Sequence, residues 1–499
     1  MNSLLQELDR RLAPAHVVVD DGSTLHTWQD LREGVLQLAA LLQSLGVSRV
    51  ALHADNGVDW LLADLACQHA GMACIPLPLF FSEAQRSHVL AAAGVDAILT
   101  QMPELFAQSG QQARACPGVG LALLLRQPAQ PAALPEGTGK VTFTSGSTGT
   151  PKGVCLSTQH QLRQAAALQQ AVGLQAPRHL CVLPLGVLLE NVAGVYAPLL
   201  AGGTVLLRPL QNLGFEGSSL RHPERFLQAL QELQPDSLIL IPQLLQVLVH
   251  AAASGWQPPA FRFIAVGGAR VAASLISAAR RLGLPVYEGY GLSECASVVS
   301  LNTPADDRPG TCGRPLPHVQ LEQRDGEFVI HGNLMLGYLG AAASWYPREF
   351  ATGDLGCIDG DGFVHIEGRR KNLLISSYGR NIAPEWIESE LLATMLFRDA
   401  VVVGEALPWC SALLYPVNGE LGTTQIQQAI DRINARLPDY ARIKSWLRLA
   451  QPLAATPELL TPNGRPRRTA INQHYQQQIA ALYPESRYRS EALAQEARA

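Results

Sequence analysis

Short apolar runs alternate along the chain with longer segments in which apolar residues recur every three or four positions. The runs at 50–53, 74–77 and 97–100 predict buried strands, while the segments 31–45 and 60–70 predict helices. A parallel pair of strands needs a long crossover connection, which is usually a helix. The beginning of the chain therefore predicts an α/β fold with a parallel sheet.

The alternation resumes after a segment, 111–137, whose Pro, Ala, Gly and Gln content predicts a loose connection. The strands predicted beyond it are 140–144, 179–183, 204–207, 237–241, 261–266 and 286–287. The helices predicted between these strands are 190–201, 223–234 and 272–282. We find no internal repeat, so the pattern predicts an α/β architecture across most of the chain.

The pattern changes near residue 310 to short strands and turns. Asp-Gly pairs at 325–326, 359–360 and 361–362 are typical hairpin signals. We place the main domain boundary at 369–372, after this β-rich stretch.

A smaller unit follows the boundary. Its predicted helices are 384–394 and 424–437, and 400–403 is a predicted strand. The polar end of the chain, 485–499, is expected to fray. We therefore predict two domains, 1–370 and 371–499.

Composition excludes several classes of protein. The 499 residues are 47% apolar and 16% charged, which allows a large core and excludes wholesale disorder. Lys and Arg number 38 against 42 Asp and Glu, and this balance argues against a nucleic-acid partner. No apolar stretch approaches about 20 residues and the N-terminus lacks a signal-peptide core, so we expect no integral membrane segment.

The cysteines indicate a reducing compartment. There are nine of them, an odd number, and none forms a C-x-x-C pair. This usage fits buried thiols in a cytoplasmic protein and argues against a disulfide framework or a zinc site. Almost all of the cations are arginines, which singles out the four lysines, Lys140, Lys152, Lys371 and Lys444.

The strongest local signal is the segment 144–153, a Gly/Ser/Thr loop that follows the predicted strand 140–144. Glycines let backbone N–H groups turn toward an anion, hydroxyl groups donate further hydrogen bonds, and Lys152 adds a positive charge. Pro151 before that lysine excludes the common P-loop, and Ser145 excludes a nucleophile elbow, which needs glycine there. By composition alone, an ordinary flexible loop is an equal alternative.

The string T-S-G-S-T-G-T-P-K-G at 144–153 closely resembles the phosphate-binding motif of adenylate-forming enzymes. These are the acyl-CoA synthetases, the adenylation domains of nonribosomal peptide synthesis and the luciferases. The resemblance implies that ATP phosphates contact Lys152 and the loop. The implied loop residues are Thr144, Ser145, Gly146, Ser147, Thr148 and Gly149.

Further motifs of the same family follow in order, so that the resemblance covers about residues 20–470. The segment 286–294 resembles the adenine and metal motif, in which Tyr290 would stack on adenine and Glu294 would hold Mg²⁺. Residues 266–269 resemble the strand end that lines the adenine and acyl pockets. The remaining implied nucleotide contacts are Gly268, Ala269, Glu288, Gly289, Gly291 and Ser293.

The motifs near the predicted domain boundary complete the resemblance. Asp354 stands in a T-G-D motif whose carboxylate would bind both ribose hydroxyls, and Arg369 would contact ribose or phosphate oxygens. Lys371 occupies the family's hinge position. Gly379 lies in the loop that lines the thiol tunnel of relatives in the second half-reaction.

The resemblance implies a large N-terminal α/β domain with a smaller, mobile α+β C-terminal domain. The large domain would contain two sheet-and-helix subdomains and a small β-barrel-like part. Rotation of the small domain at Lys371 would exchange the adenylation and thiolation arrangements.

One departure from the family pattern concerns catalysis. Arg465 stands where relatives carry the lysine that approaches the carboxylate and the α-phosphate. Arginine keeps the charge and can bridge both groups, but it is bulkier. Three readings remain: Arg465 does the work, another cation compensates, or adenylation is impaired.

A second departure concerns the acid. The segment 183–191 lacks the His or aromatic residue that many relatives place near Val187, and it lacks the Asp of amino-acid-activating members. Glu190 fits the pattern of long-chain fatty-acid members. The expected pocket residues, for which core packing is an equal alternative, are Leu188, Leu189, Glu190, Leu244, Val266 and Gly267.

The resemblance therefore implies an enzyme that uses ATP and Mg²⁺ to convert an apolar acid to an acyl-adenylate. Lys152, Glu294, Arg465 and Lys371 would be its catalytic residues. The acyl group would pass to a thiol such as that of CoA. One alternative is the phosphopantetheine of an acyl carrier protein, or an amine, as acceptor; another is a binding protein that has lost adenylation.

Overall fold

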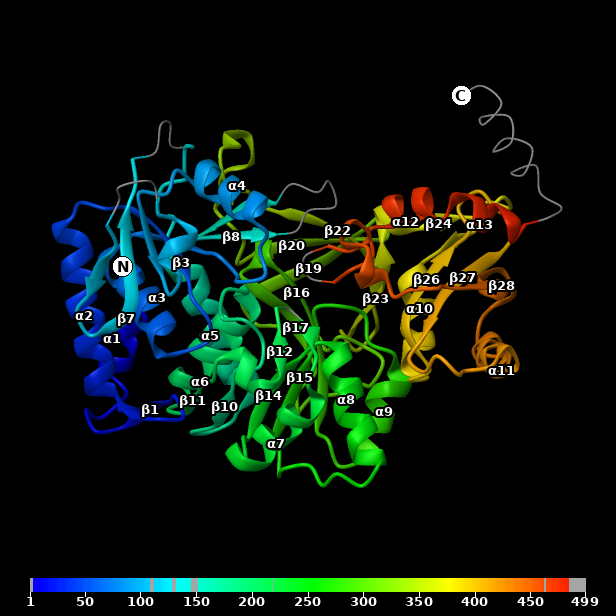
Figure 1. Ribbon diagram of the computed structural model, residues 1–499, viewed down its shortest axis with the longest axis horizontal. Coiled ribbons are helices and arrows are strands. Elements are labelled where there is room, and N and C mark those ends of the chain that lie inside the picture. The colour runs from blue at the N-terminus through cyan, green and yellow to red at the C-terminus, as the bar shows by residue number, and fades with distance from the viewer. Residues whose placement is uncertain are drawn as a thin grey trace. The chain divides into compact units, whose positions relative to one another are not determined.

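The computed structural model describes residues 3–107, 112–127, 132–144, 151–217, 219–461 and 464–483 (Figure 1). The chain divides into two compact units. Unit 1 comprises Met1–Gly268, Ala279–Glu322 and Val329–Ala351, and unit 2 comprises Ala269–Ala278, Gln323–Phe328 and Thr352–Ala499.

One large sheet of unit 1, sheet A, contains most of the strands predicted between residues 179 and 287. In spatial order its strands are β18 (Arg314–Pro315), β17 (Ser297–Leu301), β16 (Val286–Leu292), β15 (Phe263–Val266), β14 (Ser237–Leu240), β10 (Arg178–Leu180), β11 (Thr204–Leu206), β1 (Val17–Asp20) and β2 (Leu25–Thr27). The pairs from β16 through β11 to β1 are parallel, and the pairs at both edges are antiparallel.

A second large sheet of unit 1, sheet B, contains the predicted strands before residue 144. Its order is β21 (Gly337–Tyr338), β9 (Lys152–Leu156), β8 (Lys140–Thr144), β4 (Ala73–Pro76), β3 (Arg49–His53), β5 (Ala97–Thr100), β7 (Val119–Leu125) and β6 (Arg114–Cys116). The pairs β3–β4, β3–β5 and β4–β8 are parallel, which confirms the predicted parallel α/β core.

The helices of unit 1 connect these strands. They are α1 (Leu4–Asp9), α2 (Trp28–Ser44), α3 (Val58–Ala70), α4 (Glu83–Ala93), α5 (Thr158–Val172), α6 (Ala197–Leu200), α7 (Pro223–Leu233) and α8 (Pro242–Ala253). Local sequence sets their ends. Thr27 and Asp30 form a capping box at the start of α2, and Gly71 ends α3 with a left-handed φ of 71°.

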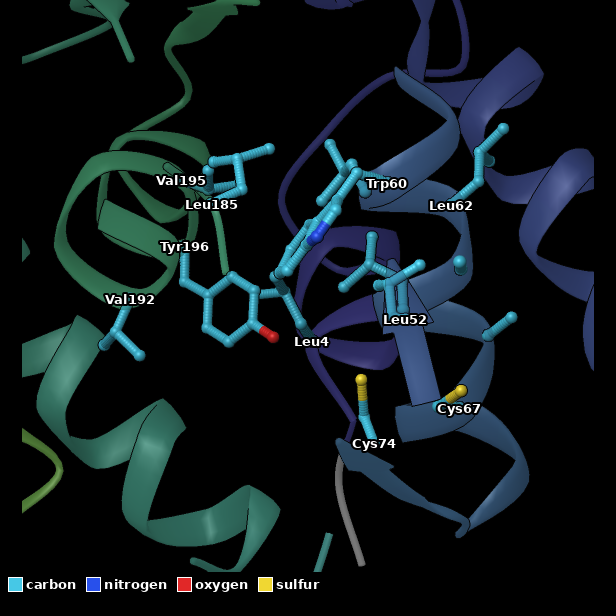
Figure 2. Close-up of a cluster of buried hydrophobic side chains, with 14 of the residues drawn as sticks. Leu4, Leu52, Trp60, Leu62, Cys67, Cys74, Leu185, Val192, Val195 and Tyr196 are labelled. Atoms are coloured by element: carbon cyan, nitrogen blue, oxygen red, sulfur yellow. The ribbon is translucent and has the colours of Figure 1, made fainter. Parts of the chain in front are cut away.

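A cluster of buried side chains joins α3 to the helical segment that follows residue 190. Figure 2 shows Trp60 of α3 between Tyr196 on one side and Leu52 of β3 on the other. The predicted helix 190–201 consists of a π-helix, η2 (Glu190–Tyr196), followed directly by α6. A π-helix is rare and is frequently found at functional sites.

The prediction of a loose connection over 111–137 was wrong for part of that segment. β6 and β7 form an antiparallel pair there, and β7 also pairs with β5. The apolar run of β7 is a strand signal, but the surrounding Pro, Gly and Gln residues dominate the composition of the window.

Unit 2 contains a compact α+β arrangement. Its elements include most of β22 (Phe350–Ile358), and β23 (Val364–Arg369), β24 (Leu374–Ile375), β25 (Asn381–Ile382), α10 (Pro384–Ala393), β26 (Phe397–Val403), β27 (Cys410–Pro416), α11 (Thr423–Asn434), β28 (Ile443–Arg448), α12 (Arg468–His474) and α13 (Gln476–Ala481). Figure 1 shows α10 beside β26, where both contribute to one apolar core. The predicted helices at 384–394 and 424–437 are confirmed as α10 and α11.

The remaining elements are short or contain residues of both units. The 3₁₀ helices are η1 (Pro103–Leu105), η3 (Leu210–Leu213), η4 (Ser293–Cys295), η5 (Ala342–Ser344), η6 (Arg370–Asn372), η7 (Asp439–Ala441), η8 (Leu453–Ala455) and η9 (Pro457–Leu459). The other elements are α9 (Ala273–Arg281), β12 (Phe215–Glu216), β13 (Ser219–Leu220), β19 (Val319–Arg324) and β20 (Glu327–Gly332).

The state of the cysteines is as expected. Each of the nine cysteines is a free thiol, and eight are buried, as the sequence predicts. Among the described helices, none combines the length and the apolar character that crossing a bilayer requires.

Candidate active site

The predicted phosphate loop joins two paired strands of sheet B. Thr144 ends β8 and lies directly opposite Lys152, the first residue of β9. Its loop members Ser145, Gly146, Ser147, Thr148 and Gly149 lie outside the described residues. The hairpin therefore holds the two ends of the predicted phosphate loop side by side.

A tyrosine links the predicted phosphate and metal residues of unit 1. Tyr338 lies on β21, which pairs with β9, and the Lys152 ammonium nitrogen is 5.5 Å from the centre of its ring. The Tyr338 hydroxyl donates a hydrogen bond of 3.0 Å to Oε1 of Glu294. Three side chains from distant parts of the sequence thus meet at one edge of the sheet.

Electrostatics fixes the direction of the Tyr338–Glu294 hydrogen bond. Burial raises the pKa of Tyr338, and the Glu294 carboxylate raises it further. The phenol therefore stays protonated near neutral pH and acts as the donor, while the carboxylate accepts. The backbone N–H of Met335 donates to the Glu294 carbonyl, which also anchors this residue.

The oxygen chemistry of Glu294 suits a magnesium ion. Magnesium prefers oxygen ligands and is usually held by one or two carboxylates together with substrate phosphates. Oε1 of Glu294 accepts from Tyr338, and its side chain is only half-buried, which leaves the carboxylate accessible to an ion. When bound, the ion would supply positive charge that neutralises phosphate oxygens.

The predicted adenine segment lies where parallel strands of sheet A end. Val266 at the end of β15 pairs with Glu288 of β16, and Gly267 continues past that end. A Cβ atom added to Gly267 would lie 2.9 Å from the Gly289 carbonyl oxygen, so glycine permits this close approach. Ligands in α/β proteins usually bind at such carboxyl ends.

The predicted residues of this segment differ in exposure. Glu288 is buried, and its Oε1 accepts a hydrogen bond from the Cys312 thiol at 3.7 Å. Gly289, Tyr290 and Ser293 are half-buried, and Gly291 is exposed. Glu288 is therefore placed to support the backbone, whereas the other residues leave surface for a ligand.

Unit 2 brings together another set of predicted residues. Asp354 of β22 and Arg369 of β23 are directly opposite each other, and Nε of the arginine is 2.8 Å from Oδ1 of the aspartate. The Asp354 side chain is 4% exposed and that of Arg369 is 40% exposed. An arginine fixed in this way orients the carboxylate that the sequence assigns to ribose.

Arg465 lies on a tight turn of unit 2. Its N–H donates to Thr461 Oγ1 at 3.0 Å, and its carbonyl accepts from the Thr461 N–H at 2.8 Å. Although the residue is exposed, partial loss of hydration lowers the pKa of its guanidinium, and Arg369 lowers it further. The carboxylates of Asp354 and Glu385 oppose this shift, so Arg465 shares the electrostatic environment of the predicted ribose site.

Two further predicted residues of unit 2 belong to a short helix and to a turn. Lys371 belongs to the 3₁₀ helix η6 (Arg370–Asn372) and is exposed. Gly379 lies in the turn between β24 and β25 with a φ of 72°, and an added Cβ would meet no atom within 4 Å. The exposed turn has room for a ligand on its surface, but its left-handed backbone favours glycine.

An apolar cavity of about 80 Å³ lies within unit 1, between α5, the segment that follows residue 189, and strands of sheet A. Leu189 lines it, as do Ala265, Phe263 and Leu301. The predicted residues Leu188, Leu244 and Val266 are buried but do not line this cavity, and Glu190 is fully buried. The structure thus shows an apolar space that reaches one of the residues predicted for the acyl pocket.

Sequence analysis missed Tyr338 and Cys312. Tyr338 meets Lys152 only because β21 pairs with β9 across nearly 200 residues of chain, and no local signal predicts that pairing. Cys312 was grouped with ordinary buried thiols. Its contact with Glu288 depends on the loop that precedes β18.

Two family models match this chain in succession. The family model described as AMP-binding enzyme matches residues 7–339, and the model of the AMP-binding enzyme C-terminal domain matches residues 371–487. A feruloyl-CoA synthase from Amycolatopsis is 30% identical over 453 residues, which cover 82% of this chain and 87% of the relative.

Two solved structures share the fold. The anthranilate CoA ligase in complex with anthranoyl-AMP has a TM-score of 0.80 at 17% identity, covering 95% of this chain and 97% of that one. The amide bond synthetase from Marinactinospora thermotolerans has a TM-score of 0.75 at 24% identity, covering 95% and 99%. Both likenesses confirm the predicted α/β fold.

The sequence match decides the family. One family model covers more than half of the chain, and a relative with 30% identity is matched over most of its length. The family suggested by the motif at 144–153 is therefore confirmed. The chain belongs to the AMP-binding enzyme family.

Proposed function

We propose that the protein activates an apolar carboxylic acid with ATP and transfers the acyl group to the thiol of CoA. The single observation that carries this proposal is the meeting of Lys152, Tyr338 and Glu294 in a member of the AMP-binding enzyme family. A cation and a hard carboxylate ligand beside a glycine-rich loop suit a nucleotide triphosphate and its magnesium ion.

The first step joins the acid to AMP. A carboxylate oxygen of the acid attacks the α-phosphorus of ATP, and the bond between that phosphorus and the bridging oxygen to the β-phosphate breaks. Pyrophosphate leaves with the electron pair. No protein nucleophile is needed, so the protein acts by positioning the reactants and balancing charge.

Lys152 would stabilise the phosphate oxygens in this step. Its ammonium group is exposed and stacked on the Tyr338 ring, and no ion pair with a described carboxylate neutralises it. Asp354, oriented by Arg369, would accept hydrogen bonds from the ribose hydroxyls. The backbone around Gly267 and Gly289 would receive the adenine ring.

Arg465 would take the role of the family lysine. Its position in the electrostatic environment of Asp354 and Arg369 supports this reading. Its guanidinium can donate to a carboxylate and a phosphate oxygen at the same time. The other two readings, compensation by another cation and loss of adenylation, become outcomes of the experiment.

The second step transfers the acyl group to sulfur. The thiolate of the acceptor attacks the acyl carbon, the bond from that carbon to the AMP oxygen breaks, and AMP leaves with the electron pair. The thiol proton is released to solvent. We propose that the turn at Gly379 borders the thiol path and that 371–499 moves as a separate domain about Lys371.

The apolar cavity supports an apolar acyl or aryl acid. Leu189, Ala265 and Phe263 offer hydrocarbon surface, and polar acids would lose hydration there without compensation. The nine free thiols support a reducing compartment such as the cytoplasm.

The experiment is acid-dependent exchange of labelled pyrophosphate into ATP, followed by acceptor tests. Medium- and long-chain fatty acids, aryl acids and amino acids would be tried separately with Mg²⁺. We expect exchange with one apolar class, and AMP release that rises when CoA is added. Exchange only with amino acids, or turnover only with a phosphopantetheinylated carrier protein or an amine, would overturn the stated substrate or acceptor.

A further inference from the structure

A buried group of metal-binding side chains lies in unit 1 away from Lys152 and Glu294. His179 is on β10, Cys181 follows it on the same segment, and Glu190 begins the π-helix η2. Nε2 of His179, Sγ of Cys181 and a carboxylate oxygen of Glu190 all lie within 4.8 Å of one another. Together they offer nitrogen, sulfur and oxygen donors.

The separation of two of these donors is that of a long hydrogen bond and also fits two ligands of a shared ion. Nε2 of His179 and Oε1 of Glu190 are 3.4 Å apart, which is long for an N–H···O bond. Two ligands at ordinary zinc distances in a tetrahedral site lie roughly 3.3 Å apart. The pair is therefore already spaced as ligands, and Cys181 Sγ would need only a modest adjustment.

Glu190 supplies an independent indication of a missing partner. The residue is 0% exposed, and within the described part of the chain its Oε2 lacks a donor at good hydrogen-bond geometry, although the Leu183 N–H and the Cys181 thiol face the carboxylate. A buried carboxylate oxygen without a donor is costly. A cation between the three side chains would satisfy it.

Gly194 keeps side-chain atoms away from the donor atoms. A Cβ atom added to Gly194 would lie 2.6 Å from Oε1 of Glu190 and 2.9 Å from Nε2 of His179. The carbonyl of this glycine accepts from the Cys181 thiol at 3.6 Å, so it faces the same group. Glycine on the π-helix therefore leaves the three donor atoms unobstructed, and its carbonyl oxygen adds a fourth donor atom close to the sulfur.

A second layer of contacts orients the histidine. Nδ1 of His179 is 2.9 Å from the Ser237 hydroxyl of β14, which directs Nε2 toward Glu190. Histidine ligands of metal ions usually make such a hydrogen bond through the other ring nitrogen. Imidazole and thiolate favour zinc or a neighbouring transition metal over magnesium or calcium.

We propose that His179, Cys181 and Glu190 form a structural binding site for a divalent transition-metal ion, with Zn²⁺ as the occupant that its donors fit best. The ion would tie β10 to the first turn of η2. That turn follows directly after Leu188 and Leu189, so the site would also hold the wall of the apolar cavity in place. It is distinct in position and ligand chemistry from the magnesium site at Glu294.

The odd number of cysteines and the lack of a C-x-x-C pair argue against a zinc site in the sequence. That argument covers only sites whose ligands follow local spacing rules. Here the three ligands come from a strand, the residue that follows it and a π-helix, and only the fold brings them together.

The test measures metal in the full-length protein. The buried site would fill during folding, so the protein is produced in medium supplemented with zinc or, in parallel, with cobalt, and is purified without chelators. We expect about one tightly held ion per chain by elemental analysis. The cobalt form is expected to show a thiolate-to-cobalt charge-transfer band.

Two substitutions assign the ligands. Cys181→Ser should remove the charge-transfer band, and the nearly isosteric Glu190→Gln should lower metal content at least tenfold while leaving the fold intact by circular dichroism. Cys410→Ser is the matched control, because Cys410 is an equally buried thiol of unit 2 outside the group. It should change neither readout.

Three outcomes would overturn the proposal. They are a wild-type protein without bound zinc or cobalt, a cobalt band that survives Cys181→Ser, and equal metal content in wild type and Glu190→Gln. Thermal unfolding of the zinc form and of protein unfolded and refolded with a chelator adds a second readout. We expect the chelated form to melt several degrees lower, and equal melting temperatures would contradict a structural ion.

Discussion

The two ends of the β8–β9 hairpin carry lysines with opposite surroundings. Lys140 begins β8 and is 2% exposed, with its ammonium nitrogen 2.8 Å from Oδ1 of Asp64 and in contact with Asn191 and Tyr196. Lys152 begins β9, is exposed and stacks on the ring of Tyr338. On this hairpin one lysine is therefore buried in the core, and the other is exposed to solvent.

The two lysines differ in whether their charge is already balanced, and this decides which of them can bind a substrate phosphate. The charge of Lys140 is already balanced inside the protein, so it cannot attract a phosphate from solvent. Lys152 keeps its charge available at the mouth of the predicted phosphate loop. Charge compensation, rather than position on the hairpin, separates the structural lysine from the catalytic candidate.

The largest expected effect comes from removing the buried charge. Lys140→Met would leave Asp64 buried without its counterion, which typically costs about 3–5 kcal/mol of unfolding free energy. Urea unfolding followed by tryptophan fluorescence measures the loss. The double variant Lys140→Met/Asp64→Leu should recover much of it, because both buried charges are then absent. A stable but inactive Lys140→Met protein would contradict the structural assignment.

The exposed lysine is expected to affect catalysis and leave stability unchanged. Lys152→Ala should lower pyrophosphate exchange by about 10²–10³-fold, as expected for a lost electrostatic contact to the transition state. Lys444→Ala is the matched control, because its ammonium nitrogen also lies 5.5 Å from an aromatic ring centre, that of Trp409. If both variants lose exchange equally, Lys152 has no special role.

A smaller effect is expected from the hydroxyl that joins the lysine end of the hairpin to Glu294. Tyr338→Phe keeps the ring below Lys152 but removes the 3.0 Å hydrogen bond to the carboxylate. We expect roughly a tenfold loss in kcat/KM for Mg-ATP, in line with a hydrogen bond to a charged group. Tyr346→Phe, which removes an exposed hydroxyl bonded to the Glu136 backbone, should leave it unchanged. Equal kcat/KM in wild type and Tyr338→Phe would remove the tyrosine from the site.

The smallest expected effect is on the pH dependence of stability and comes from His53, a buried histidine of sheet B. Burial, with a contribution from Arg86, lowers the pKa of His53 to about 4. The unfolded chain therefore binds more protons between pH 4 and 6.5, and stability falls as pH drops through this window. His53→Gln should reduce the loss between pH 7 and 5.5 by about 1 kcal/mol.

Urea midpoints at the two pH values measure this difference. In His53→Gln the stability should still fall as the pH drops, because burial also lowers the pKa values of His160 and His318 to about 4. Identical pH profiles for wild type and His53→Gln would show that His53 does not titrate as stated.

Sequence alone predicted the features that depend on local pattern. The parallel strands, the strand 140–144 that leads into the Gly/Ser/Thr loop, and Lys152 are all carried by periodicity or by a contiguous motif, whereas the pairing of β8 with β9 is not. The sequence marks Lys140 only as one of four lysines. Its role in the core is not predicted, because its partners Asp64 and Tyr196 are distant in sequence and their burial is a property of the fold.

The features that sequence missed depend on long-range pairing or on helix geometry. The contact of Tyr338 with Glu294 requires β21 to pair with β9. The π-helix at Glu190–Tyr196 reads as an ordinary helix by periodicity, and the contact of Glu190 with His179 joins this helix to β10. Sequence predicted the site's contiguous motifs, and the fold supplied the residues that support them.

We propose that this chain adenylates an apolar acid and that Arg465 replaces the family lysine. This proposal is tested most directly by acid-dependent pyrophosphate–ATP exchange with wild type, Arg465→Lys and Arg465→Ala. We predict exchange with one apolar acid class in wild type, substantial retention in Arg465→Lys and loss in Arg465→Ala. No exchange by wild type with any acid, while ATP still binds, would contradict the account.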